Sequence, residues 1–486
     1  MAKILIIGAG VAGLSAGIHA RLHGHEAVIC EKHFISGGNL TAWDRSGYHI
    51  DNCIHWLTGT NPATPTYRMW ETLGALGDVE IHQGESLFTC EHEGKRISLY
   101  QDLERTEQEM LALSPEDKKE IRAFIKTVRY LQGLCGVAGE QHNKKAIFPQ
   151  IIPAVPLLFG YYALTTGELS EKFKHPLLKL FFKGFFGTDF GALALILVCA
   201  HYCGNNGGIP KGSSSAMADR MTERFQNLGG KLLLKKEAVK IQTENNKAHS
   251  VLFSDGTEIC ADYIVLTADP TTVFGKLLDL PLPKALQQSY QNPRFLRFSA
   301  YHCAFACTCE ELPFEGDLIF PIPEEYQSTL LTDRVIVREF SHEKDFSPEG
   351  QNLLQTITFT FEKDATEFIL LRKQDRAAYH ERKTELAALT QELIEKQMPQ
   401  LAGKLKCIDV WTPATYRRFT NSEIGSFMSF ALPSKAFPIC KNNRIPELSN
   451  VILATQWQQA PGGLPIAAEV GKKAIQTIAA QERKRK

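Results

Sequence analysis

The chain has 486 residues, of which 44% are hydrophobic and 22% charged, with equal numbers of acidic and basic side chains. This is the composition of a globular protein, and the length predicts two or three domains, or one body with interleaved parts. The zero formal net charge provides no long-range field that would favour nucleic acid as a partner.

The twelve cysteines are irregularly spaced, which indicates free thiols in a reducing compartment rather than a disulfide framework. The apolar run at the N-terminus continues into glycines without a small-residue cleavage site, so we do not expect a signal peptide. Because no apolar stretch is long enough to span a bilayer, the sequence predicts a cytoplasmic protein. Association with a membrane surface stays open.

The N-terminal stretch has the order of parts found in a dinucleotide-binding unit. The short apolar run Lys3–Ile7 predicts a buried strand that leads directly into the glycine-rich residues 8–13. We expect a helix over residues 14–24 and a second strand over residues 27–30 that ends at Glu31. Glu31 lies roughly 20 residues beyond the glycines, where a carboxylate accepts hydrogen bonds from a ribose. A coincidental strand–helix–strand unit is the alternative.

Each glycine of residues 8–13 has its own purpose in this interpretation. Gly8 allows the tight turn out of the strand, Gly10 leaves room for a pyrophosphate, and Gly13 lets the helix lie close to the sheet. The helix N-terminus, which includes Val11 and Ala12, offers free N–H groups and the positive end of its dipole to the phosphates.

Two further motifs follow this unit. Residues 37–40 read Gly-Gly-Asn-Leu, and paired glycines give backbone flexibility beside a bound cofactor, although an ordinary turn is the alternative. Residues 47–51 read Gly-Tyr-His-Ile-Asp and predict a hairpin strand. Together with residues 8–13 and Glu31, these motifs resemble the phytoene desaturase-like branch of the flavin amine oxidase superfamily. That branch includes carotenoid desaturases, carotene isomerases and retinol saturases.

The resemblance implies tightly but noncovalently bound FAD, with the first glycines on the pyrophosphate and Glu31 on the adenosine ribose. It also implies that Val239 touches the adenine and that residues 463–465 lie beside the isoalloxazine. Ala268 is expected in a loop at the C-terminal end of a strand, where open α/β sheets bind ligands. The expected FAD contacts are Gly8, Gly10, Val11, Ala12, Gly13, Glu31, Lys32, Gly37, Gly38, Asn39, Leu40, Val239, Ala268, Gly463, Leu464 and Pro465. The chain departs from the family pattern at Ser213, which stands in place of a glycine, and at Ala454 and Thr455.

The resemblance implies an α/β fold with a Rossmann-like FAD-binding domain of the glutathione reductase type. This domain is expected to be assembled from three segments, residues 1–65, 206–275 and 421–486. Residues 66–205 are expected to form a helical cap that faces the substrate or a membrane. Residues 276–420 contain runs of period two and predict an inserted α+β substrate domain with an antiparallel sheet.

Residues 146–186 are apolar but interrupted by prolines, which predict short, broken helices. In residues 172–186 lysines are interspersed with phenylalanines. One interpretation is a helix packed on the core with its lysines outside. The other is a membrane-surface face or a tunnel entrance, around which the lysines snorkel. The basic tail, residues 482–486, is either a solvated end or a weak contact for anionic lipid.

Three cysteines, Cys303, Cys307 and Cys309, share one parity in a predicted strand and would lie on the same face. Because no histidine accompanies them on that face, small apolar packing is favoured over a metal site. We therefore expect no metal.

The sequence shows no Ser/His/Asp or metal-ligand arrangement, in keeping with a flavin that accepts hydride itself. His55 and Trp56 are the candidate catalytic residues, because the resembling family places this segment near the flavin ring. A packed core pair is the alternative. Since no second strand–GxGxxG–helix unit follows, we expect a separate electron acceptor or donor, which is oxygen, a quinone or a reductase.

The leading functional hypothesis is an FAD-dependent oxidoreductase that desaturates, saturates or isomerises C–C or C=C bonds. Its substrate would be a long, apolar, carotenoid- or lipid-like small molecule. One alternative is oxidation of a CH–NH group, as in flavin amine oxidases. The other is a lipid-binding scaffold in which FAD is only structural.

Overall fold

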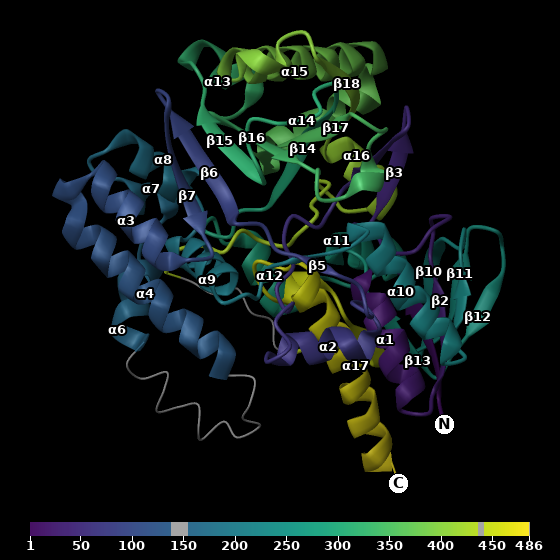
Figure 1. Cartoon of the computed structure of the whole chain (residues 1–486). Coiled ribbons are helices and arrows are strands. Elements are labelled where there is room, and N and C mark those ends of the chain that lie inside the picture. Colours follow the sequence, from purple (N-terminus) through teal and green to yellow (C-terminus); the bar gives the residue numbers. More distant parts are fainter. Residues whose placement is uncertain (138–153, 436–441, 486) are drawn as a thin grey trace.

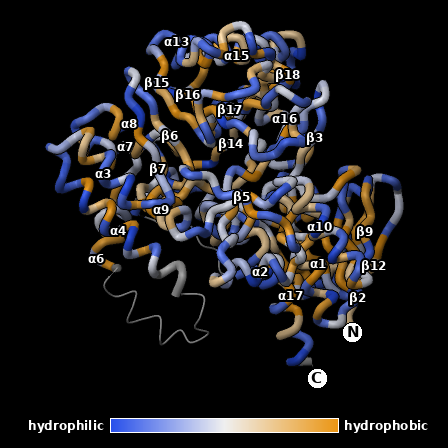
Figure 2. Tube along the Cα trace, in the orientation of Figure 1, coloured by the Kyte–Doolittle hydropathy of each residue, from blue (hydrophilic) through white to orange (hydrophobic). Residues whose placement is uncertain are grey.

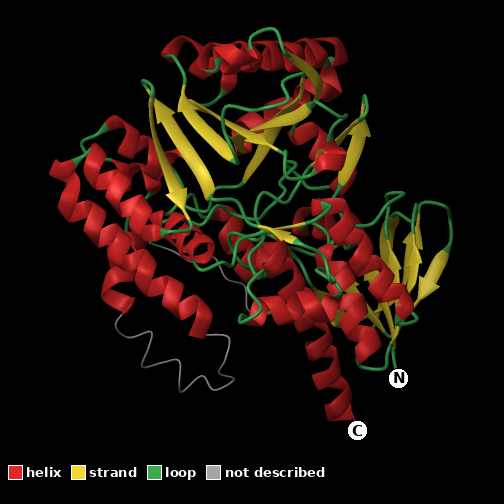
Figure 3. Ribbon diagram, in the orientation of Figure 1, coloured by secondary structure: helices red, strands yellow, loops and turns green. Residues whose placement is uncertain are grey.

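The computed structural model describes residues 1–137, 154–435 and 442–485 (Figure 1). Within them the chain forms a parallel sheet with a covering three-stranded sheet, a larger mixed sheet, and helices that pack on both (Figure 3). Residues 147–149 and 151–153, which belong to the expected apolar segment, lie outside the described residues.

The parallel sheet has six strands in the order β19-β20-β13-β1-β2-β9, and only β19 runs antiparallel to its neighbour. The strands come from three distant stretches of sequence. They are β1 (Lys3–Ile7), β2 (Glu26–Cys30), β9 (Lys231–Leu233), β13 (Tyr263–Leu266), β19 (Arg444–Ile445) and β20 (Leu448–Leu453). The expected strands over residues 3–7 and 27–30 are confirmed.

The parallel sheet is covered differently on its two faces, because successive side chains of a strand point to opposite sides. Ile4 and Ile6 pack toward a layer of helices. Leu5 and Ile7 pack toward the three-stranded antiparallel sheet. The helices are α1 (Val11–Leu22), α10 (Ser213–Asn227) and α17 (Leu464–Arg485), and the small sheet contains β10 (Ala238–Glu244), β11 (Lys247–Phe253) and β12 (Glu258–Cys260).

The larger sheet has seven strands in the order β18-β14-β17-β16-β15-β6-β7, with β15 and β6 parallel and the other neighbours antiparallel. Figure 2 shows the hydrophobic character of its strands β15 and β16. The strands are β6 (Ser86–His92), β7 (Lys95–Tyr100), β14 (Phe298–Cys307), β15 (Asp317–Pro321), β16 (Arg334–Glu339), β17 (Asn352–Phe361) and β18 (Leu405–Trp411).

One face of the seven-stranded sheet packs on helices of residues 324–397, and the long helix over residues 376–397 lies above the sheet in Figure 1. They are α13 (Glu324–Leu330), α14 (Glu362–Gln374) and α15 (Arg376–Gln397). Cys303 and Cys307 are free and buried in this apolar layer. Their packing is the one favoured from sequence.

A helical body packs against the end of the seven-stranded sheet that is formed by β6 and β7. It consists of α3 (Leu103–Leu113), α4 (Lys118–Val137), α6 (Ala154–Tyr162), α7 (Thr166–Ser170), α8 (Pro176–Gly184) and α9 (Ala192–Cys203). Smaller elements connect the bodies. They are the hairpin β3 (Ala42–Arg45) and β4 (Tyr48–Asp51), α2 (Pro65–Leu73), the pair β5 (Ile81–His82) and β8 (Ile209–Pro210), α11 (Pro270–Thr272), α12 (Lys284–Gln291) and α16 (Pro413–Thr420).

The expectation that residues 66–205 form a helical cap is wrong for residues 86–100. These residues form the hairpin β6–β7, with Glu93 and Gly94 at positive φ in its turn. Strand β6 pairs with β15, where Phe88 lies opposite Asp317. This pairing joins residues more than 200 positions apart, so local sequence gives little sign of it.

The phenylalanines of residues 172–186 do not form a membrane-facing surface. Phe181 and Phe182 of α8 are 0% and 1% exposed and pack against Phe124 of α4. The lysines on the outer side of α8 form ion pairs, Lys179 with Glu171 and Lys183 with Asp333. The packed-helix interpretation therefore holds for α8. No helix in the described ranges is long and apolar enough to cross a bilayer.

Candidate functional site

The first glycine loop joins the end of β1 to the start of α1. Gly8 has a φ of 104°, which favours glycine. A Cβ atom on Gly13 would lie 1.9 Å from the carbonyl oxygen of Gly8, so only glycine lets α1 approach the strand this closely. Gly10 is the N-cap of α1, and no side chain caps the first turn of the helix.

The second glycine loop lies directly against the first. The amide of Gly37 donates a hydrogen bond to the carbonyl oxygen of Ala9 at 2.8 Å, and Gly10 and Gly37 form a parallel bridge. A Cβ on Gly38 would lie 3.2 Å from Cα of Gly10. The two loops therefore meet backbone to backbone at the N-terminus of α1.

Glu31 follows β2, and its buried carboxylate faces the first loop. One carboxylate oxygen accepts from the amide of Ala9 at 2.8 Å and the other from the amide of His33 at 2.9 Å. Each oxygen keeps a lone pair for a further donor. The neighbouring Lys32 turns elsewhere, because its Nζ donates to Oδ1 of Asn421 at 2.6 Å and to the carbonyl of Arg418. Burial lowers the pKa of Lys32.

The C-terminal loop before α17 joins this arrangement through the carbonyl oxygen of Phe427. That oxygen accepts from the side-chain amides of Asn39, at 3.4 Å, and Gln456, at 3.2 Å. Gln456 in turn accepts from the amide of Gly463 at 2.9 Å. Residues from both ends of the chain thus meet at one place.

Helix α17, which begins at Leu464 and Pro465, packs closely on α1. The hydroxyl of Ser15 donates to the carbonyl of Ala468 at 2.6 Å, and a Cβ on Gly471 would lie 2.3 Å from the carbonyl oxygen of Ala12. The two helix N-termini therefore start on the same side of the sheet (Figure 1).

The remaining expected contacts lie at the border of this region. Leu40 is buried in the core under the loops. Ala268 follows β13 and packs partly buried against the small sheet. Val239, on β10, is 40% exposed, and nearby Lys236 donates its amide to the carbonyl of Glu31.

These residues fit a dinucleotide. The amides at the start of α1 have no capping side chain, and helix N-termini bind phosphate oxygens. A Cβ on Gly10 would meet nothing closer than the carbonyl oxygen of Gly37 at 3.8 Å, so the protein does not crowd this position where a pyrophosphate would approach the backbone. Glu31 supplies a ribose acceptor, and exposed Val239 supplies an apolar surface for a base.

The candidate pair His55 and Trp56 separates in the structure. His55 turns toward the seven-stranded sheet and lines a small cavity there. Trp56 packs with the helical body, and a Cβ on Gly207 would lie 3.2 Å from its ring. Burial, reinforced by Arg338 and His302, lowers the pKa of His55 well below its ordinary value. The imidazole is therefore neutral at neutral pH.

Sequence reasoning missed the polar side chains that line this cavity with His55. His302, Asp317, Arg338 and Gln355 come from four neighbouring strands of the seven-stranded sheet. Burial lowers the pKa of His302 to about 3. The sequence offered one signal for such residues, namely a polar side chain within an apolar run of period two.

A hydrogen-bond chain links the second glycine loop to this cavity. Asn52 donates to the carbonyl of Asn39 at 2.9 Å, and its oxygen accepts from Trp411 and from the hydroxyl of Tyr416, each at 2.9 Å. The same Tyr416 hydroxyl lies 3.0 Å from Nε2 of His302. The side chains of the sheet are thus positioned relative to the glycine loops.

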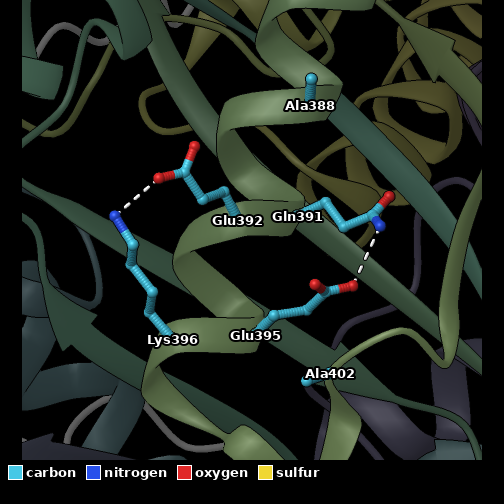
Figure 4. A pocket seen from close by; sticks show the side chains of 6 residues that line it. All are labelled: Ala388, Gln391, Glu392, Glu395, Lys396 and Ala402. Carbon is cyan, nitrogen blue, oxygen red and sulfur yellow. Dashed lines mark hydrogen bonds and ion pairs between the residues drawn. The ribbon is translucent and has the colours of Figure 1, made fainter.

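A hollow of about 420 Å³ on the outer face of α15 is unrelated to these groups (Figure 4). Lys396 pairs with Glu392 at 2.6 Å, and Gln391 donates to Glu395 at 3.0 Å. Pairs one turn apart are typical of a solvated helix face. Across the described residues no group of histidine, cysteine and acidic side chains could hold a metal ion.

The two glycine loops, Glu31 and the start of α1 define a dinucleotide-binding protein, and comparison with known proteins establishes that it is a flavin-dependent oxidoreductase. The chain belongs to the flavin containing amine oxidoreductase family, whose model matches residues 11–419. Its cofactor is FAD, and within the superfamily it lies in the phytoene desaturase-like branch.

The relatives have low sequence identity to this chain, but the alignments cover more than half of it. A chloroplastic prolycopene isomerase of Daucus carota is 24% identical over 454 residues, which cover 87% of this chain and 71% of that protein. The neurosporene-forming phytoene desaturase of Rhodobacter capsulatus is 23% identical over 57% of this chain and 54% of its own length. An inactive all-trans-retinol 13,14-reductase of Danio rerio is 23% identical over 78% of this chain and 65% of that protein.

Solved structures show the same fold. An oxidoreductase from Methanosarcina mazei matches with a TM-score of 0.61 and 16% identity, over 98% of this chain and all of that one. Putrescine oxidase with bound putrescine matches with a TM-score of 0.58 and 15% identity, over 99% of both chains.

Proposed function

We propose that the six-stranded parallel sheet and its two covering layers form an FAD-binding Rossmann-like domain of the glutathione reductase type. Its three sequence segments are residues 1–65, 206–275 and 421–486, which supply all six strands. Residues 276–420 form the substrate domain, and the strands β6 and β7 extend its sheet from within the 66–205 segment.

The meeting of the two glycine loops at the start of α1 carries this proposal. The amides of residues 10–13 would hold the pyrophosphate, Glu31 the adenosine ribose, and Val239 the adenine. Gly37, Gly38 and Asn39 would lie along the ribityl chain, and the start of α17 at Gly463 would lie beside the isoalloxazine. None of these contacts needs a covalent bond, so we expect FAD to be held noncovalently.

The reaction we propose is desaturation, saturation or isomerisation of C–C or C=C bonds in a long apolar polyene. Bound FAD supplies the two-electron chemistry. The chain supplies a dry site. His55 is neutral and half-buried. His302 is held by a hydrogen bond with the Tyr416 hydroxyl and by stacking on Trp411, with the two ring centroids 4.6 Å apart. These groups would orient the substrate between the seven-stranded sheet and the glycine loops. The relatives that act on carotenoids and retinol, by their names, support this substrate class.

The electron acceptor or donor is a separate molecule in this proposal, namely oxygen, a quinone or a reductase. A peripheral contact with a lipid surface would involve α6, where Val155 and Phe159 are exposed, and not the buried phenylalanines of α8.

Purification and lipid analysis test the proposed function. The protein should be yellow and should release FAD on acid precipitation. Anaerobic photoreduction should give a reduced flavin that a polyene, a quinone or oxygen reoxidises. Mass spectrometry of lipids from cells with and without the protein should reveal a polyene that differs between the two by one double bond or by the cis or trans geometry of a double bond. A flavin that cannot be reduced, or that no acceptor reoxidises, would instead support a scaffold with structural FAD.

A further inference from the structure

The cavity beside His55 is lined by polar side chains on an otherwise apolar sheet face. Asp317 lies opposite Arg338, and Arg338 lies opposite Gln355, across three neighbouring strands. The strand register therefore places all three on one face, together with Ile336 and Ile357, which also line the cavity. This face is turned away from α15 and toward the helical body and the glycine loops.

Two nitrogen donors on residues that line this cavity have no acceptor among the described residues. Arg338 uses Nε and Nη2 to bind both oxygens of Asp317, at 2.6 and 2.7 Å. Its third nitrogen, Nη1, is buried without a partner, and so is Nε2 of Gln355. Both residues are 6% exposed.

Such unpaired donors are rare in folded proteins, because each buried donor without a partner is destabilising. Two of them on adjacent strands, at one cavity, point to an acceptor that binds there. The cavity measures about 10 Å³, which is room for one group the size of an oxygen atom or a water molecule. Ile336 and Ile357 supply the apolar part of the lining.

We propose that Arg338 and Gln355 bind an oxygen at the end of the substrate, either a carbonyl or a carboxylate oxygen. The substrate is then a polyene with an oxygenated end and not a pure hydrocarbon. This inference rests on the proposed function and narrows its substrate class. Arg338 and Gln355 are specificity residues, and the flavin chemistry does not depend on them.

Binding of three matched polyenes to the FAD-loaded protein tests the proposal. The probes are all-trans-retinal, all-trans-retinoic acid and axerophtene, which has the same polyene with a methyl end. Their dissociation constants can be measured from changes in flavin absorbance and fluorescence. We expect at least one oxygenated probe to bind about 10- to 150-fold more tightly than axerophtene, as one hydrogen bond to a charged donor predicts. A preference for the acid identifies a carboxylate, and a preference for the aldehyde identifies a carbonyl.

The variant Gln355→Leu removes one donor and should not harm folding, because that donor has no partner. It should reduce the advantage of the oxygenated probe about tenfold and leave axerophtene binding unchanged. A second variant, Asp317→Leu combined with Arg338→Met, removes the ion pair as a unit and should abolish the advantage. Gln288→Leu, on the exposed face of α12, is the matched control.

Equal binding of the three probes, or an oxygenated advantage that survives both variants, would overturn the proposal and leave a water in the cavity. Failure of all three probes to bind would overturn it as well. The proposed function fails separately, if no polyene of either kind exchanges electrons with the flavin or is isomerised by the FAD-loaded protein.

Discussion

The amide of Gly37 donates a hydrogen bond to the carbonyl oxygen of Ala9 at 2.8 Å, and together with the parallel bridge between Gly10 and Gly37 this bond holds the two glycine loops against each other. It uses a backbone carbonyl of the first loop and leaves the amides at the start of α1 free of capping side chains. The phosphate-binding surface is thus built from backbone, and substitutions of single glycines can separate its folding from its binding.

The first prediction compares Gly10 with Gly13. Gly10→Ala should fold normally, because Gly10 has an ordinary φ of −71° and the new Cβ would make only ordinary van der Waals contacts, none closer than 3.8 Å. It should lose FAD, because the methyl group occupies the space proposed for the pyrophosphate. Gly13→Ala should destabilise the apoprotein itself, since its Cβ would lie 1.9 Å from a carbonyl oxygen. Denaturation of the apoproteins and FAD titration give the two readouts. Normal FAD affinity in folded Gly10→Ala would place the pyrophosphate elsewhere.

The second prediction concerns Glu31→Ala. Loss of the ribose acceptor should weaken FAD binding by about 1.5–3 kcal/mol, roughly 10- to 150-fold in affinity. The apoprotein should also lose about 1–3 kcal/mol of stability, because the amide of Ala9 is left without its acceptor. FAD titration and urea unfolding of the apoprotein separate these effects. Glu26→Ala, at an exposed position on β2, the strand that precedes Glu31, should change neither quantity. FAD affinity that matches the wild type would mean that another residue holds the ribose.

The strand–helix–strand unit was readable from sequence because all its signals are local. The glycines, the apolar runs and Glu31 follow one another within 31 residues, and β1, α1 and β2 lie where the pattern predicts.

The polar cavity was not readable, because its residues come together only through strand register. Both faces of β14 are buried, so alternation along this strand does not tell which face His302 occupies. Arg338 and Gln355 meet only because β16 and β17 pair as they do. The hairpin β6–β7 was missed for the same reason, since its place in the sheet depends on a partner far along the chain.

The third prediction concerns the phenylalanines of α8. Phe181→Ser or Phe182→Ser should destabilise the protein by about 3–5 kcal/mol, because each ring is fully buried and the change leaves a cavity and a buried hydroxyl. Phe159→Ser on α6 is the matched control, since its ring is 66% exposed, and its effect should stay within about 0.5 kcal/mol. Urea unfolding of the FAD-loaded proteins measures the difference. If the α8 variants are as stable as the control, the helix does not pack in the core.

The last prediction concerns the loss of stability at acidic pH. Burial lowers the pKa of His302 to about 3 in the folded protein, whereas an unfolded histidine has a pKa of about 6.5. Above pH 6.5 the residue is neutral in both states and adds no pH dependence. Between pH 6.5 and 3 the unfolded state binds the proton more readily, so the free energy of unfolding falls as the pH falls. The loss is on the order of 4–5 kcal/mol when complete, a large share of the ~5–15 kcal/mol of a typical domain.

His302→Gln tests this directly, because the side-chain amide of glutamine can still form a hydrogen bond with the hydroxyl of Tyr416 but cannot be protonated. Between pH 7 and pH 5 the wild type should lose about 2 kcal/mol more stability than the variant. His380→Gln, on the exposed face of α15, should follow the wild type. Burial lowers the pKa values of His19 and His342 to about 4. These two residues therefore make every variant lose some stability in acid. If the wild type and His302→Gln have the same pH dependence, His302 is either protonated in the folded protein or open to solvent, and the dry site proposed around it would be wrong.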